Sequence, residues 1–199
     1  MSKVIMINHL TLDGVVQAPG RADEDPRGDF AYGGWAQPGN DDIMAKVMMA
    51  QFPEGASLLL GRRTYQQLGE YWPTQPDSPF STMLENIPKY VVTRTLSTAP
   101  VWASSTTLIT DAVDQVAALK EKGTSMVIFG SAELTKSLTA AGLVDRYVIM
   151  IHPVLVGPGL RLFPTSGPYS RLALLDSTIT TTGVMIGIYE PTEPTEPAA

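Results

Sequence analysis

Short apolar runs alternate with segments of helical periodicity along most of this chain. Runs rich in aliphatic and β-branched residues predict strands at 3–8, 57–60, 90–93, 108–109, 126–129 and 146–151. Apolar residues spaced three or four apart predict helices at about 42–51, 62–70, 111–122 and 132–141, with a helical turn at 82–86. Strands that alternate with helices favour an α/β fold with a mostly parallel sheet and helices on both of its faces.

The C-terminal part of the chain follows a different pattern. Segments 173–181 and 184–189 predict two strands joined at Thr182-Gly183, and therefore an antiparallel edge on the sheet. Residues 154–155 could extend or restart the strand before them. The last residues, 191–199, are rich in proline and glutamate and have no apolar anchor, which predicts a disordered tail. Residues 1–190 are expected to form a single domain.

The acidic composition and the lack of cysteine narrow the classes of function. A net charge of -6 and a pI of about 4.8 argue against a nucleic-acid surface or a polybasic membrane contact. Without cysteine there is no disulfide or thiolate chemistry, which fits a cytoplasmic protein. No run of about 18 apolar residues occurs, so no membrane span is expected. Two histidines far apart in the sequence, His9 and His152, predict no metal site.

Three predicted strands end in small or basic residues where the next segment begins. They lie in LLLGRRTY (58–65), YVVTR (90–94) and VIFGSAEL (127–134). In a parallel sheet, ligands bind beyond the carboxyl ends of the strands, and a helix that starts there directs free N–H groups toward them. Glycine allows an anion to approach the backbone closely. The residues expected to meet a phosphate-rich ligand are Arg62 or Arg63, Thr64, Thr93, Arg94, Gly130, Ser131 and Ala132.

Each of these strand ends is also compatible with an ordinary turn. Neither the P-loop pattern nor the Rossmann glycine pattern is present, so the residues alone do not distinguish a dinucleotide from another phosphorylated ligand. Adjacent side chains on a helix point about 100° apart, so only one of Arg62 and Arg63 is expected to face the ligand.

The order of the motifs resembles the dihydrofolate reductase fold. It is more closely similar to the reductase domain of bifunctional riboflavin biosynthesis enzymes, the RibD C-terminal domain family, in a stand-alone form without the deaminase domain. The segments that carry the resemblance span about 160 residues. They are TLDG (11–14), GRRTY (61–65), VVTR (91–94), VIFGSA (127–132), LVDR (143–146), PVLVGPG (153–159) and LFP (162–164).

The resemblance implies an NADPH-dependent reductase of a small heterocycle such as a pteridine or a pyrimidine, with hydride transfer to a C=N or C=O bond. It also implies a homodimer, formed through the region 146–155. The cofactor-binding residues that it implies are Gly14, Gly61, Arg62, Arg63, Thr64, Thr93, Arg94, Phe129, Gly130, Ser131, Ala132, Glu133 and Leu134.

Carboxylates near the expected site are candidates for the proton donor that such a reduction needs. We expect Asp13 or Asp42 in this role, with Asp41 or a bound water as alternatives; each aspartate could equally be a turn residue or a helix cap. The substrate candidates are His9, Trp35 and Met48, for which ordinary packing is the alternative. The long irregular stretch 15–40 is expected to close over the substrate.

Two other functions stay open at this point. One is a reductase whose acceptor is a flavin or a quinone. The other is a non-catalytic nucleotide-binding protein that has kept the cofactor site and lost the chemistry.

Overall fold

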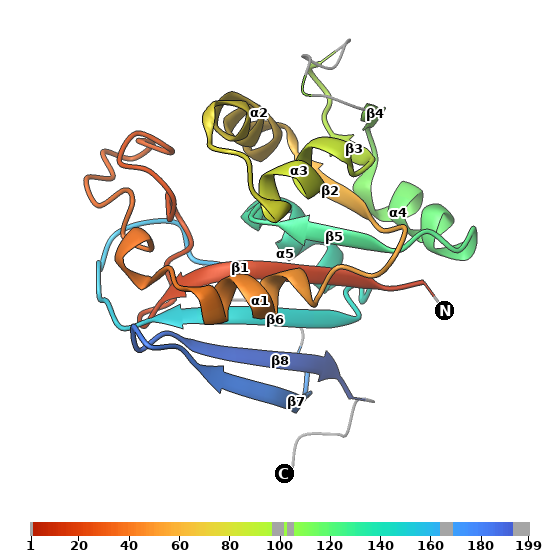
Figure 1. Cartoon of the computed structure of the whole chain (residues 1–199). Coiled ribbons are helices and arrows are strands. Elements are labelled where there is room, and N and C mark those ends of the chain that lie inside the picture. Colours follow the sequence, from red (N-terminus) through yellow and green to blue (C-terminus); the bar gives the residue numbers. More distant parts are fainter. Residues whose placement is uncertain (1, 97–101, 103–105, 164–168, 193–199) are drawn as a thin grey trace.

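The sheet of this protein has the strand order β4-β3-β2-β5-β1-β6-β8-β7 (Figure 1). The computed structural model describes residues 2–96, 102, 106–163 and 169–192, and all eight strands lie within these ranges. They are β1 (Val4–Thr11), β2 (Ser57–Gly61), β3 (Lys89–Val92), β4 (Thr106–Ile109), β5 (Met126–Phe129), β6 (Arg146–His152), β7 (Leu172–Ile179) and β8 (Met185–Pro191).

Short helices connect the strands. They are α1 (Asp42–Met49), α2 (Arg62–Tyr71), α3 (Pro79–Asn86), α4 (Ala112–Glu121) and α5 (Ala132–Ala140), with the 3₁₀ turns η1 (Gln37–Gly39) and η2 (Trp72–Thr74). Strands β1 to β6 pair in parallel, whereas β8 runs antiparallel to β6 and β7 runs antiparallel to β8. The structure therefore confirms the mostly parallel sheet with an antiparallel C-terminal edge.

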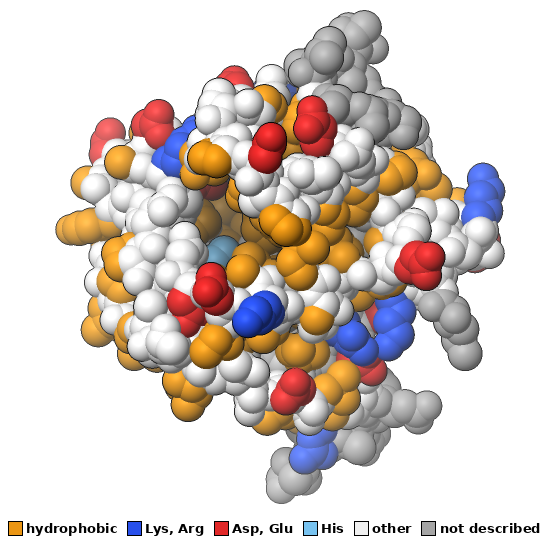
Figure 2. Space-filling view, in the orientation of Figure 1, with side chains coloured by type: hydrophobic (Ala, Val, Ile, Leu, Met, Phe, Trp, Pro, Cys, Tyr) orange, Lys and Arg blue, Asp and Glu red, His pale blue; other side chains and the backbone are white. Residues whose placement is uncertain are grey.

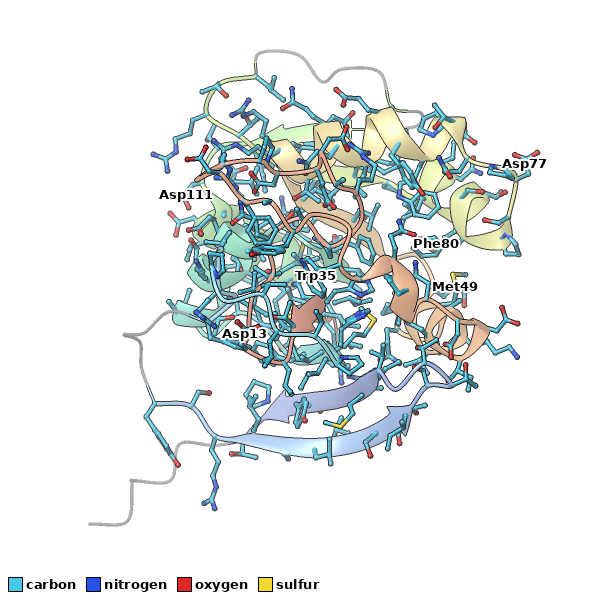
Figure 3. The ribbon with its side chains drawn as sticks, turned by 90° about the vertical axis from the view of Figure 1, so that its left-hand side faces the viewer. Asp13, Trp35, Met49, Asp77, Phe80 and Asp111 are labelled. Atoms are coloured by element: carbon cyan, nitrogen blue, oxygen red, sulfur yellow. The ribbon has the colours of Figure 1, made fainter. Side chains whose placement is uncertain are left out.

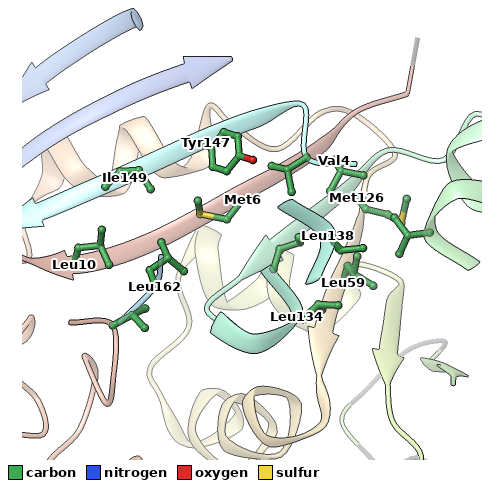
Figure 4. Close-up of a cluster of buried hydrophobic side chains, with 14 of the residues drawn as sticks. Val4, Met6, Leu10, Leu59, Met126, Leu134, Leu138, Tyr147, Ile149 and Leu162 are labelled. Atoms are coloured by element: carbon green, nitrogen blue, oxygen red, sulfur yellow. The ribbon is translucent and has the colours of Figure 1, made fainter. Parts of the chain in front are cut away.

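Alternation along the strands places helices on both faces of the sheet, as predicted. Successive side chains of a strand point to opposite faces. Val4 and Met6 of β1 belong to the same buried cluster as Leu138 of α5 (Figure 4), whereas Ile5 packs with Met44 of α1. Full burial of each such aliphatic side chain contributes about 1.5–3 kcal/mol. These two layers fix the position of β1 in the middle of the molecule.

Several boundaries differ from the sequence prediction. Strand β1 continues past Asn8 to Thr11, because parallel pairing with β6 covers its polar residues as well. Helix α3 begins at Pro79, since Ser78 and Ser81 form a capping box there. Residues 154–155 form no strand: the N–H of Val154 donates to the carbonyl of His152, and Leu155 is 70% exposed.

The C-terminal strand also reaches further than expected. Strand β8 continues through Pro191, and the Glu190 carboxylate accepts from Lys3 Nζ and Arg146 Nη2, each at 2.7 Å. Glu190 and Pro191 therefore belong to the folded domain. Residues 193–199 of the predicted tail, and Pro164 of the last motif, lie outside the described residues.

The long stretch between β1 and α1 packs beyond the carboxyl ends of the strands (Figure 1). It is tied to the segment before β7: Val16 N donates to the carbonyl of Leu160, and Leu160 N donates to Gln17 Oε1. We call residues 12–36 the β1–α1 loop. Within the described residues, no helix is long and apolar enough to cross a membrane.

Candidate functional site

A first cavity of about 320 Å³ opens beyond the carboxyl ends of β1, β2 and β5. The turns after β2 and β5 lie side by side there because these two strands are neighbours in the sheet. Eleven residues predicted for the site line this cavity. They are His9, Gly61, Arg62, Arg63, Thr64, Phe129, Gly130, Ser131, Ala132, Glu133 and Leu134.

Strand β5 ends at the turn Gly130-Ser131 because of the backbone conformation of these two residues. Both residues have left-handed backbones, with φ of +64° at Gly130 and +51° at Ser131. A Cβ at Gly130 would lie 3.3 Å from Thr64 Cγ2, so glycine also keeps the two turns close together. Ser131 Oγ accepts from Gly61 N at 3.0 Å and joins the turns directly. Helices α2 and α5 both begin here without a side-chain cap, so their positive N-terminal ends face the cavity.

Arginines surround this cavity. Arg62 and Arg63 both line it, although we expected only one of them to do so. Arg27 of the β1–α1 loop lines it too and is paired with Asp25, with Nε 2.6 Å from Oδ1. The hydrogen bond from Arg27 and the nearby charge of Arg63 hold the pKa of Asp25 below its usual range. An anionic ligand would therefore meet positive charge from α2 and from the loop.

Asn8 was not predicted and is a second polar feature of the first cavity. It is 1% exposed in the middle of β1, and its Nδ2 has no hydrogen-bond partner among the described residues. A buried amide without a partner is costly unless a ligand or water satisfies it. The signal in the sequence was a polar residue directly after four apolar residues of the strand VIMINHLT.

Three predicted cofactor residues, Gly14, Thr93 and Arg94, lie outside both cavities. Thr93 is buried, and its Oγ1 accepts from Thr95 N and Leu96 N, which closes the turn after β3. Arg94 follows it and is exposed. Strand β3 is separated from β5 by β2, so its turn lies to one side of the first cavity.

The predicted proton donors also lie elsewhere. Asp13 accepts from Thr11 Oγ1 at 2.6 Å and from Gly157 N at 2.9 Å, and these bonds, chiefly that from Thr11, lower its pKa. Together with Gly14, whose φ is +84°, it fastens the loop after β1 (Figure 3). Asp42 is exposed in the first turn of α1. None of these three residues lines either cavity: turn hydrogen bonds hold Asp13 beside Gly14, and Asp42 is exposed on α1.

A second cavity, also of about 320 Å³, lies between the β1–α1 loop, α1 and α2. Figure 2 shows a hollow on this face, bordered largely by hydrophobic side chains, with a histidine visible inside. Met48 lines the cavity as predicted. Tyr71, Trp72, Phe80 (Figure 3) and Phe129 form an aromatic wall, in which the rings of Trp72 and Phe80 are 5.1 Å apart.

Trp35 does not line either cavity. Its Nε1 donates to the carbonyl of Gln17 at 2.7 Å, and its ring packs edge-on against His152, 5.3 Å between centroids. Asp41 does line the second cavity, but its carboxylate caps α1 through Met44 N at 2.8 Å, a bond that is the main cause of its lowered pKa. Both side chains hold the loop and helix in place.

The two cavities adjoin. Six residues line both of them: His9, Pro19, Glu24, Gln67, Leu68 and Phe129. His9 Nδ1 lies 2.8 Å from Nε2 of His152. Burial, and secondarily the His152 charge, lower the pKa of His9 to about 3; burial lowers that of His152 to about 4. Both rings are therefore neutral at pH 7, and one nitrogen of the pair donates while the other accepts.

Pro19, Glu24, Gln67 and Leu68 of this boundary were not predicted from the sequence, and Glu24 is the titratable one among them. Its Oε2 accepts from Gly20 N at 2.6 Å and from Arg21 N at 3.1 Å. Burial raises its pKa. It stands among other acidic residues in an aperiodic stretch, so no local pattern singled it out. Among the described residues, no group of three or more histidine and acidic side chains could hold a metal ion.

Known structures define the class of fold. The chain is similar over 97% of its length to all of a protein described as a riboflavin biosynthesis protein from Shewanella sp. PV-4 (20% identity, TM-score 0.68). It is similar over 97% to 93% of a pyrimidine reductase-like protein from Corynebacterium diphtheriae (12% identity, TM-score 0.63). It also spans 57% of a Thermotoga maritima deaminase/5-amino-6-(5-phosphoribosylamino)uracil reductase, with 96% of its own length covered (13% identity, TM-score 0.61). The chain therefore has the predicted dihydrofolate reductase-like α/β fold.

The family follows from the sequence match. A family model described as the RibD C-terminal domain matches residues 2–186, and the chain belongs to this family. A curated relative, the uncharacterized protein YyaP of Bacillus subtilis (strain 168), is 27% identical over 139 residues, which cover 67% of this chain and 72% of that protein.

Proposed function

We propose that this protein is an NADPH-dependent reductase of a small heterocycle, such as a pteridine or a pyrimidine. The observation that carries the proposal is the pair of adjoining cavities beyond the carboxyl ends of the sheet, which share six lining residues. A reductase needs two ligands whose reacting atoms meet, and such a pair of cavities provides that arrangement. Membership of the RibD C-terminal domain family supports it.

The residues of the first cavity fit a phosphate-rich dinucleotide. Arg62 and Arg63 would hold phosphate groups, and the Gly130-Ser131 turn would let the pyrophosphate approach two helix N-termini. The unpartnered Nδ2 of Asn8 offers a further donor to the ligand. When bound, NADPH supplies a hydride to the substrate.

The second cavity fits a flat ring. Its aromatic and methionine side chains would pack against the faces of the substrate and exclude water. His9 would hydrogen-bond at the boundary as a neutral imidazole, held in orientation by His152. An acceptor of the flavin or quinone type has the same flat shape and is tested alongside the heterocycles.

A fluorescence titration with NADPH and NADH tests the first step, because a nicotinamide bound at the boundary would lie next to the second cavity, which Trp72 lines, and would quench its fluorescence. We expect tighter binding of NADPH. Arg62→Ala and Arg63→Ala should each weaken it by about tenfold or more, the range for a lost charge-assisted hydrogen bond. The control is Lys46→Ala, on the exposed face of α1, which should change nothing. Arg94→Ala tests the predicted contact between Arg94 and the cofactor, because Arg94 lies outside both cavities.

Two outcomes contradict the proposal, one in the titration and one in an assay of NADPH oxidation. If neither nucleotide binds, the enzyme function is wrong. If NADPH binds but is oxidised with no dihydropteridine, aminopyrimidine, flavin or quinone, the protein is a nucleotide-binding protein without this chemistry. The cytoplasmic location, the homodimer, and the absence of nucleic-acid and membrane partners stay predictions.

A further inference from the structure

We propose that Glu24 is the residue that donates a proton to the substrate at the boundary between the two cavities. The inference rests on the proposed function, because a proton is needed only if a double bond is reduced in the second cavity. Glu24 comes from the β1–α1 loop. Among the described acidic residues, it is the one that lines both cavities.

The carboxyl group of Glu24 is held in one orientation. Gly20 N and Arg21 N both donate to Oε2, and none of the described residues donates to Oε1. Because two N–H groups occupy Oε2, the proton of the acid form belongs on Oε1. The backbone is fixed as well, since Gln67 Nε2, from α2, donates to the carbonyl of Glu24. Gln67 lines both cavities too, so the anchor and the carboxyl group lie at the same boundary.

The surroundings of Glu24 favour the acid form more than water does. Burial has the largest effect and raises its pKa, Asp25 raises it further, and the N–H groups and the charge of Arg21 act in the opposite direction. Both charged neighbours are engaged elsewhere: Arg21 Nε donates to Asp23, and Asp25 is paired with Arg27. The third neighbour across the boundary, His9, is neutral. A general acid for work near pH 7 needs such a raised pKa.

Asp25, Asp41 and His9 are poorer donors than Glu24, and Glu133 and Tyr71 each line one cavity only. Asp25 and Asp41 each line one cavity, and hydrogen bonds lower the pKa of both, so they stay ionised. His9, with a pKa of about 3, carries no proton that it could release without becoming an anion. Glu24 therefore combines the boundary position with a raised pKa.

The proposed step balances as follows. Reduction of a C=N bond adds a hydride to carbon and a proton to nitrogen; for a C=O bond the proton goes to oxygen. The O–H bond at Oε1 of Glu24 breaks, and an N–H or O–H bond forms on the substrate. Glu24 is left as a carboxylate, which the N–H groups of Gly20 and Arg21 stabilise at Oε2. Water returns the proton after the product leaves.

Glu24→Gln is the decisive variant, because its amide oxygen can still accept from Gly20 and Arg21 while the proton donor is lost. Asp29→Asn is the matched control, in the same loop, exposed, and with a φ of +54° that asparagine tolerates. We expect Glu24→Gln to bind NADPH as the wild type does. Its kcat should fall about 100-fold, in the range attributed to general acids. The pH profile of kcat should also lose the decrease at high pH that deprotonation of the acid causes in the wild type.

A second measurement does not depend on turnover. In ¹³C NMR spectra of glutamate-labelled protein, assigned with Glu24→Gln, the Glu24 carboxyl should titrate above the ordinary value of about 4.3. A midpoint below that value overturns the proposal, as does an unchanged kcat and pH profile in Glu24→Gln. Failure of the wild type to bind NADPH or to reduce any acceptor is a different result: the proposed function then fails, and this proposal fails with it.

Discussion

His9 and His152 form a hydrogen-bonded pair of imidazole rings at the end of β1 and β6, 2.8 Å apart. Local sequence could not predict this contact. It depends on parallel pairing between two strands that are far apart in the chain, and on Trp35, which packs over His152. The predicted residues that did reach the first cavity, such as Arg62 and Gly130, belong to short motifs at strand ends. Asp13, Trp35 and Glu24 are placed by loop packing, which no local pattern encodes.

The histidine pair makes stability sensitive to mild acid. The pKa of His152 is about 4 in the folded protein and near 6.5 in an unfolded chain, so below pH 6.5 only the unfolded state takes up a proton there. Its contribution is present above pH 6.5 and is lost as the pH falls toward 4. Between pH 7 and pH 5, the titration of His152 should lower the free energy of unfolding by about 2 kcal/mol.

Urea unfolding at pH 7 and pH 5 measures this effect. His152→Gln can keep a hydrogen bond to His9 but cannot titrate, so its free energy of unfolding should fall by about 2 kcal/mol less than that of the wild type. Equal losses in the two proteins would show that His152 does not stay neutral in the folded state.

At the level of elements, the strands and helices follow from the sequence more closely than the site does. Period-two and helical patterns are local, so β2, β5, α2 and α5 were predicted to within about a residue. Strand β1 was predicted to end at Asn8 and continues to Thr11, because pairing with β6, which no local pattern shows, extends it through His9. The two turns that end β2 and β5 are joined by the Ser131 hydroxyl, although they are 70 residues apart.

Ser131 combines a useful hydroxyl with a strained backbone, and two substitutions separate these effects. Ser131→Ala removes the acceptor of Gly61 N and should destabilise the protein by about 1–2 kcal/mol. Ser131→Gly removes the same acceptor but suits the left-handed backbone, so it should be about 1 kcal/mol more stable than Ser131→Ala.

Thermal or urea unfolding gives the order of the two variants, and an NADPH titration gives their affinity. Both should bind more weakly than wild type, because the turns lose their connection. If the alanine and glycine variants are equally stable, the backbone at Ser131 is not strained in solution.

For the whole molecule, the antiparallel edge is the surface that needs an explanation. Strand β7 is the last strand of the sheet (Figure 1). Large apolar side chains on it and on β8 are exposed. Ile179 and Met185 are cross-strand neighbours, 71% and 49% exposed. Exposed apolar edges of this kind mark association surfaces. We therefore propose that a second copy of the chain covers this edge. The homodimer itself stays a prediction, and the region first expected to form it, 146–155, lies mostly in β6, an interior strand between β1 and β8.

Light scattering on the purified protein should give twice the chain mass of 21.4 kDa. Ile179→Lys, alone or with Leu174→Lys, should shift the population toward the monomer, since a buried unpaired charge is costly in an interface. Glu121→Lys, at the exposed end of α4, is the control and should leave the mass unchanged. A wild-type monomer at high concentration, or a dimer unaffected by Ile179→Lys, would contradict this assignment.

The central position of β1 has a consequence for how the protein is made. This strand pairs with β5 and β6, whose residues come more than 120 positions later in the chain. On the ribosome, the apolar segment that carries Asn8 and His9 emerges first. It stays without β5 until residue 129 has been synthesised, and without β6 until residue 152. Such non-local pairing slows folding, and until it is complete the unpaired strand edges can promote aggregation. We expect the yield of this protein to depend on synthesis rate and on chaperones more than its equilibrium stability would suggest.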